Sequence, residues 1–546
     1  MKSVCRAGVV MALWFWMSSG VVQAQFFSYT IVNNQATVSS YVGPGGAVVI
    51  PSITEIFSFP VVGIASSVFL NKSNITSISI PYGINNIGDS AFYGCTGLTS
   101  ITFPDSVTNL GNAVCNGCTG LTNATIGTNI PSIGNSAFNS CSALTACSIG
   151  GSHVKNVGDF AFFGCSGLTS IAFADSVTNF GLAVCQGCSS LTNATIGTNI
   201  FSMGNGDFYG CSALVACSIG ASRINIPDQM FSSCGKLSRL TVPNNITSIG
   251  VGSFYQCASL TNAPVGTNLT SIGQIAFSYD SALTNVIFPN TLTTIGDGAF
   301  YQCTGLTSLA IPNSVTSLGN NGVFYSCTGL TNLVFGTNVT SIGTYAFWGC
   351  GGLRSIVLPN SLISLGDYAF YLCTSVSSIT LSTNLTSIGN WVFTYCNPTS
   401  IVIPAGVTNI GDYALGGWSF VSAAIYFTGN APTNLGAGVL QGDGYGTTVY
   451  YLPGTTGWSS TFVTYPTVLW NPQAQTHDGV FGVRTNEFGF NITGNNGLQV
   501  VVLACTDLFR PVWVSVGTNT LVGGSAYFSD AAWTNYSRRF YGFGLP

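Results

Sequence analysis

Apolar and polar residues alternate in short stretches that recur along most of the chain. Leu98–Phe103 reads Leu-Thr-Ser-Ile-Thr-Phe, and one polar residue, Thr102, separates the apolar Ile101 and Phe103. This is the period of a half-buried β-strand. Pro104 would end the strand, because proline has no amide hydrogen to donate to a neighbouring strand. The pattern therefore predicts one short strand in each repeated segment.

The spacing of the cysteines gives the length of the repeat. Lys72 and Asp280 hold the same position in their repeats, and together with the cysteines they recur in steps of 23 or 24 residues. The cysteines are Cys95, Cys118, Cys141, Cys165, Cys188, Cys211, Cys234, Cys257, Cys303, Cys327, Cys350, Cys373 and Cys396. We call this position the anchor. A fixed period of this length indicates a solenoid.

Other positions keep the same register around the anchor. Phe stands three residues before it, except at Cys115 and Cys185, and Leu stands three residues after it in most repeats. Asp89–Cys95 is expected to form one short helical turn that carries Phe and Cys inward. One repeat cannot bury these side chains alone, whereas stacked repeats cover one another. The prediction is a β-rich, right-handed solenoid of about fifteen 23-residue turns with a parallel sheet.

Two longer segments resemble a known family of repeats. Ile311–Leu330 contains Ile-Pro-x-Ser-Val-Thr-Ser-Leu-Gly and then Val-Phe-Tyr-Ser-Cys-Thr-Gly-Leu. Leu292–Ser308 follows the same pattern, and both are similar to the BspA-like leucine-rich-repeat family. The resemblance covers about 65–425. It implies a leucine-rich-repeat solenoid in a secreted or surface protein that binds other macromolecules, often as an adhesin, and it supplies no catalytic motif.

Residues 1–24 have the pattern of a secretory signal peptide. Lys2 and Arg6 precede an apolar stretch at Ala7–Met17, and Val22-Gln23-Ala24 forms a small-x-small cleavage site. The alternative is an uncleaved membrane anchor. The apolar stretch is shorter than the roughly 20 residues that a membrane span needs, which favours cleavage.

The remaining boundaries follow from where the repeat register begins and weakens. We expect an N-terminal cap at 25–64 and the leucine-rich-repeat solenoid at 65–425. Degenerate repeats, a C-terminal cap and a linker at Asn471–Thr476 would occupy 426–475. Residues 477–546 lack the 23-residue register and contain strand-like segments between Gly and Asn turns, which predicts a small β-sandwich-like module.

The composition of the chain argues against some classes of function. Charged residues make up 5% of the chain and its net charge is −4. Removing 1–24 takes away Lys2 and Arg6, so 10 basic and 16 acidic residues remain, a net charge of −6. No basic stripe is present, which argues against a nucleic-acid partner. The 46% of hydrophobic residues is enough for a large buried core.

Candidate catalytic and cofactor-binding residues are few, so no cofactor and no metal site is expected. His153 and His477 fall in different predicted domains, and we expect both at the surface. No nucleophile-elbow motif is present. The acidic residues are scattered singly, and four of them follow the Gly that usually stands seven residues before the anchor. These are expected to serve turns or helix starts: Asp89, Asp297, Asp367 and Asp412.

Two C-x-x-C motifs need a separate interpretation. Cys115–Cys118 and Cys185–Cys188 would suit a four-cysteine zinc site or, beside a thioredoxin-like unit, a redox site. The repeat offers a simpler account, in which Cys115 and Cys185 replace Phe while the second cysteines are anchors. We expect the anchor cysteines to be buried and mostly reduced.

A candidate binding surface follows from the strand alternation. Residues five and seven positions after the anchor alternate with the buried ones, so they should face outward. We predict that these residues form a strand face that binds ligand: Ser100, Thr102, Asn123, Thr125, Asn193, Thr195, Arg239, Ser355, Ser378 and Thr380. Hydroxyls and amides dominate, which favours weak, repeated contacts summed over many turns.

The sequence thus favours a secreted or cell-surface leucine-rich-repeat protein that binds an extracellular protein or polysaccharide, as in adhesion, without catalysis. One alternative is a structural component of the envelope or extracellular matrix, which should have uniform faces or self-assemble. A less favoured alternative is a glycan-active enzyme, which would need two facing carboxylates in a cleft.

Overall fold

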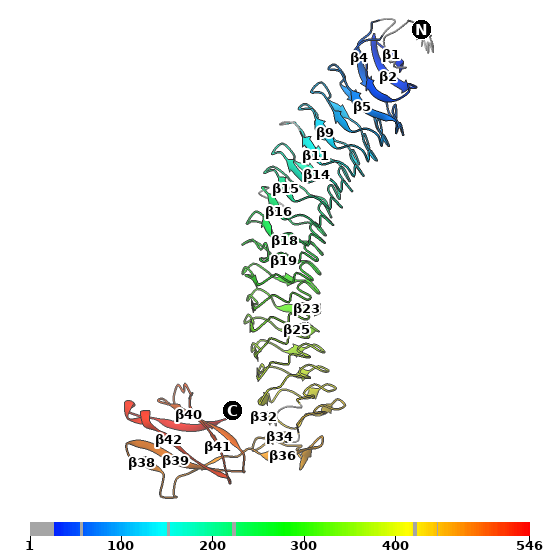
Figure 1. Ribbon diagram of the computed structural model, residues 1–546. Coiled ribbons are helices and arrows are strands. Elements are labelled where there is room, and N and C mark those ends of the chain that lie inside the picture. The colour runs from blue at the N-terminus through cyan, green and yellow to red at the C-terminus, as the bar shows by residue number, and fades with distance from the viewer. Residues whose placement is uncertain (1–26, 55–57, 150–152, 221–224, 419–422, 445) are drawn as a thin grey trace, which may run out of the picture. The chain divides into compact units, whose positions relative to one another are not determined.

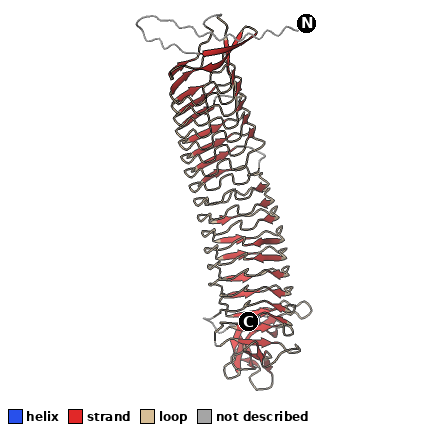
Figure 2. Ribbon diagram, turned by 90° about the vertical axis from the view of Figure 1, so that its right-hand side faces the viewer, coloured by secondary structure: helices blue, strands red, loops and turns tan. Residues whose placement is uncertain are grey.

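The computed structural model describes residues 27–54, 58–149, 153–220, 225–418, 423–444 and 446–546. The expected signal peptide therefore lies outside the described residues. The chain divides into two compact units, residues 1–306 and 307–546. In each unit, short strands recur turn upon turn in a parallel β-solenoid (Figures 1 and 2). Among the described residues there is no α-helix, and the single 3-10 helix is η1 (Ala531–Asn535).

The first unit begins with a β-hairpin that leads into the solenoid. Strands β1 (Phe27–Val32) and β2 (Gln35–Tyr41) are antiparallel, whereas β2 pairs with β4 (Val61–Ile64) in parallel. Asn33 and Asn34, in the turn between β1 and β2, have φ values of 50° and 61°, a left-handed conformation that Asn tolerates better than most residues. Strand β3 (Gly46–Val49) pairs with β5 (Ile75–Ser79) in parallel. The switch from antiparallel to parallel pairing marks the start of the stack.

Most turns of the first unit contribute strands to two columns, and isolated bridges at Ser202, Ile226 and Asn262 stand in for the missing strands. The A strands follow the anchor: β5, β7 (Ser100–Thr102), β9 (Asn123–Ile126), β11 (Ala146–Ile149), β13 (Ser170–Phe173), β15 (Asn193–Ile196), β16 (Ala216–Ile219), β17 (Arg239–Thr241) and β20 (Asn285–Val286). The B strands precede it: β4, β6 (Asn86–Ile87), β8 (Asn109–Leu110), β10 (Ser132–Ile133), β12 (Asn156–Val157), β14 (Asn179–Phe180), β18 (Ser248–Ile249), β19 (Ser271–Ile272) and β21 (Thr294–Ile295). Neighbouring strands within a column pair in parallel, as predicted.

A stack of phenylalanine rings fills the core between the columns. Phe254 and Phe277 lie 5.1 Å apart with a 5° angle between their planes, and Phe277 and Phe300 continue the stack at 5.2 Å. All of these rings are fully buried. The predicted line of buried Phe residues is therefore confirmed. Such offset stacks stabilise a core beyond their buried area alone.

The stack continues where cysteine replaces phenylalanine. Phe103, eight residues after an anchor, places its ring 6.5 Å from Phe92 and 6.4 Å from Phe138, in the gap left by Cys115. Phe173 similarly lies 6.3 Å from Phe162 beside the turn that contains Cys185. These cysteines are thus packing variants of the repeat.

The expected short helical turn between Asp89 and Cys95 is wrong. Ser90 and Gly94 have positive φ values of 56° and 68°, which a right-handed helix excludes. Alternate amides point along the stack instead, so Phe92 N donates to Val114 O at 2.8 Å in the next turn. This segment forms a third ladder of hydrogen bonds between turns, and it carries Phe and Cys inward without a helix.

The anchor thiols tie adjacent turns together. Cys95 Sγ donates to Phe69 O at 3.1 Å, and Cys234 Sγ donates to Phe208 O at 3.1 Å. Most other anchors make the same bond: Cys118, Cys141, Cys165, Cys188, Cys211, Cys257, Cys303, Cys350, Cys373 and Cys396. The described cysteines are free thiols and the anchor cysteines are buried, as predicted.

The second unit repeats both columns. Its A strands are β22 (Ser308–Ala310), β24 (Asn332–Val334), β26 (Ser355–Val357), β28 (Ser378–Thr380), β30 (Ser400–Ile403), β32 (Ala424–Phe427), β34 (Thr448–Tyr451) and β36 (Tyr465–Leu469), with β35 (Thr461–Phe462) antiparallel to β36. Its B strands are β23 (Ser317–Asn321), β25 (Ser341–Thr344), β27 (Ser364–Leu365), β29 (Ser387–Ile388), β31 (Asn409–Ile410) and β33 (Asn434–Leu435). Parallel pairing continues through β36, so the solenoid has about 17 turns rather than fifteen.

The C-terminal residues form an antiparallel region that packs on the last turns of its unit. One sheet contains β37 (Gln473–Gln475), β38 (Gly482–Arg484), β39 (Glu487–Thr493) and β42 (Ser525–Asp530), and the other contains β40 (Gln499–Cys505), β41 (Val514–Thr520) and β43 (Phe540–Gly544). Tyr426 and Tyr450 of the solenoid share a buried cluster with Phe490 and Val500. The expected linker, Asn471–Thr476, contains strand β37 and is therefore partly strand. Just before it, Trp470 donates from Nε1 to Gln499 O at 3.1 Å.

Candidate functional site

The predicted strand-face residues lie where the alternation places them. In β7, Ile101 is buried between the exposed Ser100 and Thr102. All ten predicted residues face outward. Nine of them are exposed, and Thr125 is partly buried. We call these positions, five and seven residues after each anchor, the strand face.

Strand pairing collects these residues into rows. Ser100 pairs with Asn123, and Thr102 pairs with Thr125, in the sheet of β7, β9 and β11. In the next sheet, Asn193 and Arg239 share a row. A separate pair of rows in the second unit joins Ser355 to Ser378 and Val357 to Thr380. Each row is thus a short line of neighbouring outward-facing side chains, most of them polar, in which adjacent strands are about 4.8 Å apart.

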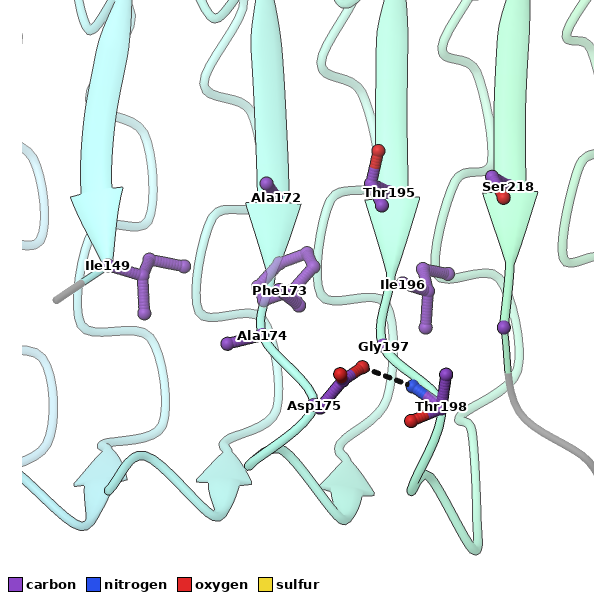
Figure 3. Close-up of a pocket in the computed structure, with 11 residues that line it drawn as sticks. Ile149, Ala172, Phe173, Ala174, Asp175, Thr195, Ile196, Gly197, Thr198 and Ser218 are labelled. Atoms are coloured by element: carbon purple, nitrogen blue, oxygen red, sulfur yellow. Dashed lines mark hydrogen bonds between the residues drawn. The ribbon is translucent and has the colours of Figure 1, made fainter. Parts of the chain in front are cut away.

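A shallow hollow of about 590 Å³ lies at the C-terminal ends of β13, β15 and β16 (Figure 3). Ala172, Thr195 and Ser218 line it from successive strands, and Asp175 and Thr198 line it from the loops below. The strand alternation identified Thr195 but not the loop residues. Their place depends on loop geometry that a two-residue strand period does not describe.

Hydrogen bonds between turns hold the rim of this hollow. Asp175 Oδ1 accepts from Thr198 N at 2.8 Å, and the Asn199 side-chain amide donates to Asp175 O at 2.9 Å. Gly197 permits this close stacking, because a Cβ atom there would lie 2.6 Å from Ala174 O. The loop is therefore held by hydrogen bonds and close backbone contacts from the neighbouring turn.

Charge on the strand face is sparse. Among the predicted strand-face residues only Arg239 is charged, and it is exposed. Asp105, which stands 70 residues before Asp175 in an equivalent loop, accepts a hydrogen bond from Thr128 N at 2.7 Å. That bond lowers the pKa of Asp105 below the ordinary value, so the carboxylate stays ionised. Such a surface provides many hydrogen-bonding groups and little electrostatic steering.

The remaining candidate chemistry is dispersed. His153 and His477 are both exposed, and His153 Nδ1 lies 3.0 Å from Thr128 O, whereas His477 Nδ1 lies 2.8 Å from Thr476 Oγ1. Asp89, Asp367 and Asp412 lie in turns, one of the two roles expected for them, and each accepts a hydrogen bond from a backbone N–H of the next repeat. Within the described ranges, no cluster of His, Cys, Asp and Glu could hold a metal ion.

No helix in the part of the chain that the structure describes has the length and apolar character of a membrane span.

Cys115 and Cys118 are both fully buried, as are Cys185 and Cys188, in the Phe and anchor positions that the repeat assigns them. Burial raises the pKa of Cys185 well above the ordinary value, and the nearby Cys188 thiol adds to this effect. Burial therefore favours the protonated thiol at Cys185, which acts as a packing group.

The columns, the short A strands and the buried Leu and Phe positions define a leucine-rich-repeat solenoid. The family described as BspA type leucine rich repeat region matches residues 62–192, 179–307 and 293–420. The chain belongs to this BspA-type family.

One solved structure of a bacterial repeat protein shares the fold, and a second gives a weaker match. A leucine-rich repeat protein from Bacteroides ovatus is 24% identical with a TM-score of 0.51, and the alignment covers 83% of this chain and 100% of that chain. A leucine rich cell surface protein from Faecalibacterium prausnitzii is also 24% identical, with a TM-score of 0.34, covering 71% of this chain and 94% of that chain. No curated protein matches the chain.

Proposed function

We propose that this protein is a secreted or cell-surface binding protein whose strand face recognises an extracellular protein or polysaccharide, as in adhesion, without catalysis. The observation that carries the proposal is the set of outward polar rows on paired A strands, with a hollow at the end of one set. The expected export signal at residues 1–24 is consistent with a ligand outside the cell.

Repetition is the physical basis of the proposed affinity. One Ser, Thr or Asn side chain contributes a weak contact, but adjacent turns present equivalent groups in register. A ligand that spans several turns sums these contacts, because later contacts form at a high effective concentration. An extended chain, either polypeptide or polysaccharide, suits such a surface best.

Binding of the full chain to immobilised collagen, laminin and a neutral β-glucan tests the proposal. We expect retention on at least one of these ligands, little loss of affinity as salt rises, and a progressive loss as whole turns are deleted. Absence of binding to every member of the panel, or binding that collapses in moderate salt, would contradict it.

A further inference from the structure

Aromatic side chains form a second surface feature at different positions of the repeat, in the second unit. We call it the aromatic ribbon, and it consists of Tyr325, Tyr345, Trp348, Tyr368, Tyr371, Trp391, Tyr395 and Tyr413. These residues stand five, two or one positions before the anchor, outside the strand face. Each ring is partly or largely solvent-exposed, and the exposed fraction of Tyr395 is 42%.

The rings overlap from turn to turn in two lines. In one line, Tyr345 and Tyr368 are stacked at 5.0 Å, and Tyr368 and Trp391 are stacked at 6.0 Å with a 6° angle. In the other, Tyr325 and Trp348 are 4.3 Å apart. Trp391 in turn is stacked on Tyr413 at 4.1 Å, so the first line continues over four turns, and its members keep part of their surface in solvent.

The backbone conformation at four of these residues does not favour a bulky side chain. Tyr345, Tyr368, Trp391 and Tyr413 all have positive φ values, between 53° and 58°. Glycine adopts this conformation readily, whereas a bulky side chain is disfavoured there. In the first unit the same position mostly holds small residues, including Ser67, Ser90, Ala113, Ser136, Ala183, Gly206, Gly252 and Gly298. Four successive aromatic residues at this position are therefore not explained by the backbone.

The charges around the ribbon restrict the ligand. Arg354 is the only Lys or Arg between residues 325 and 413, and it stands four residues after its anchor, toward the A strand. Asp367 accepts both the backbone and the side-chain amide of Asn390, at 2.8 and 3.0 Å. Two carboxylates, at Asp367 and Asp412, disfavour polyanions, and eight rings with few charges offer mainly apolar contacts and hydroxyl groups.

We infer that the aromatic ribbon binds a neutral polysaccharide. The exposed parts of the rings would pack on the C–H surfaces of sugar rings, and the tyrosine hydroxyls and indole N–H groups would bond to sugar hydroxyls. Burial, together with Tyr345 and the neighbouring carboxylates, raises the pKa of Tyr368, so its hydroxyl remains a donor. A polymer suits the ribbon because the rings repeat with every turn. This inference goes beyond the proposed function, since none of the residues belongs to the strand face.

Retention of the full chain on insoluble cellulose, chitin and mannan tests the inference. We expect binding to at least one of them that persists in high salt and weakens about tenfold or more in the double variant Trp348→Ser/Trp391→Ser. The control is Tyr93→Ser/Tyr209→Ser, which removes two exposed rings in the first unit at the repeat position of Trp348, two residues before the anchor, with exposed fractions of 38% and 37%. The control should bind like the parent protein.

A second variant separates binding from folding. Tyr345→Gly/Tyr368→Gly removes two rings and places glycine where φ is positive, so the backbone should be preserved. It should also lose affinity while its circular dichroism is unchanged. Failure to bind any neutral polysaccharide, equal binding by the Trp348→Ser/Trp391→Ser variant and its Tyr93→Ser/Tyr209→Ser control, or binding only to sulfated polymers or basic peptides would overturn the inference. A variant of the strand face that still binds the polysaccharide would show that the aromatic ribbon, and not the strand face, is the binding site for it.

Discussion

The indole N–H of Trp418 donates to the carbonyl oxygen of Phe393 at 2.9 Å. It takes the place of the anchor thiol, as in the preceding turn, where Cys396 Sγ donates to Phe370 O. We expect Trp418→Phe to destabilise the protein by about 1–3 kcal/mol, because a buried carbonyl loses its donor while most of the ring volume remains. Trp418→Ala should cost about 3–5 kcal/mol. Urea unfolding measures both, and a Phe variant as stable as the parent would contradict the role of this bond.

Asp443 occupies the following anchor position and accepts from Trp418 N at 2.9 Å. Burial raises the pKa of Asp443 to about 7, above the roughly 3.9 of an unfolded Asp. The folded state therefore binds the proton more tightly, and this contribution to stability is lost as pH rises from about 4 to about 7.

Asp443→Asn keeps an acceptor oxygen and removes the charge. The variant should be more stable than the parent at pH 8 and should lose the part of the pH dependence between pH 4 and 7. Melting temperatures measured across this range test the prediction. An unchanged pH profile would show that the carboxyl group does not titrate as expected.

Phe103 and Cys115 should be energetically coupled. Cys115→Phe alone adds a ring where Phe103 already fills the gap, and such overpacking costs about 1–3 kcal/mol. Phe103→Leu in the same chain makes room for the new ring. A double-mutant cycle should therefore give a coupling energy of about 0.5–3 kcal/mol, with the double variant more stable than the sum of the single effects. Additive effects would contradict this packing account.

The anchor cysteines should remain mostly reduced. Burial raises the pKa of the anchor Cys95 to about 12, and burial likewise raises the pKa of Cys217, six residues after an anchor, to about 12. Because the folded-state values lie above the roughly 8.5 of an unfolded thiol, stability should be fully present below that value and fall as pH rises toward 12. Thiol counting in denaturant without reductant should recover most cysteines. Finding most of the anchor cysteines oxidised would refute the prediction.

The sequence predicts the parts of the fold that repeat in residue type. Phe300 and Cys303 could be placed because the same residues recur at the same positions, and Thr195 could be placed because strands alternate. Trp418 and Asp443 were missed as anchors because they share a position with cysteine without sharing its side chain. The helical turn at Asp89–Cys95 was misjudged because alternating left-handed backbone leaves no simple pattern of apolar residues. The rim of the hollow depends on hydrogen bonds between loops of different turns, which no local pattern encodes.

The most direct test of the strand face is a comparison of two triple variants. Ser100→Asp, Asn123→Asp and Thr195→Asp place charge on the proposed surface, whereas Thr96→Asp, Thr119→Asp and Ser189→Asp place the same charge at exposed positions one residue after an anchor. Affinity for the panel member that the parent chain binds should fall in the first variant and stay unchanged in the second, at both low and high salt. Equal affinity of the two variants would contradict the account and place the binding site away from the strand face.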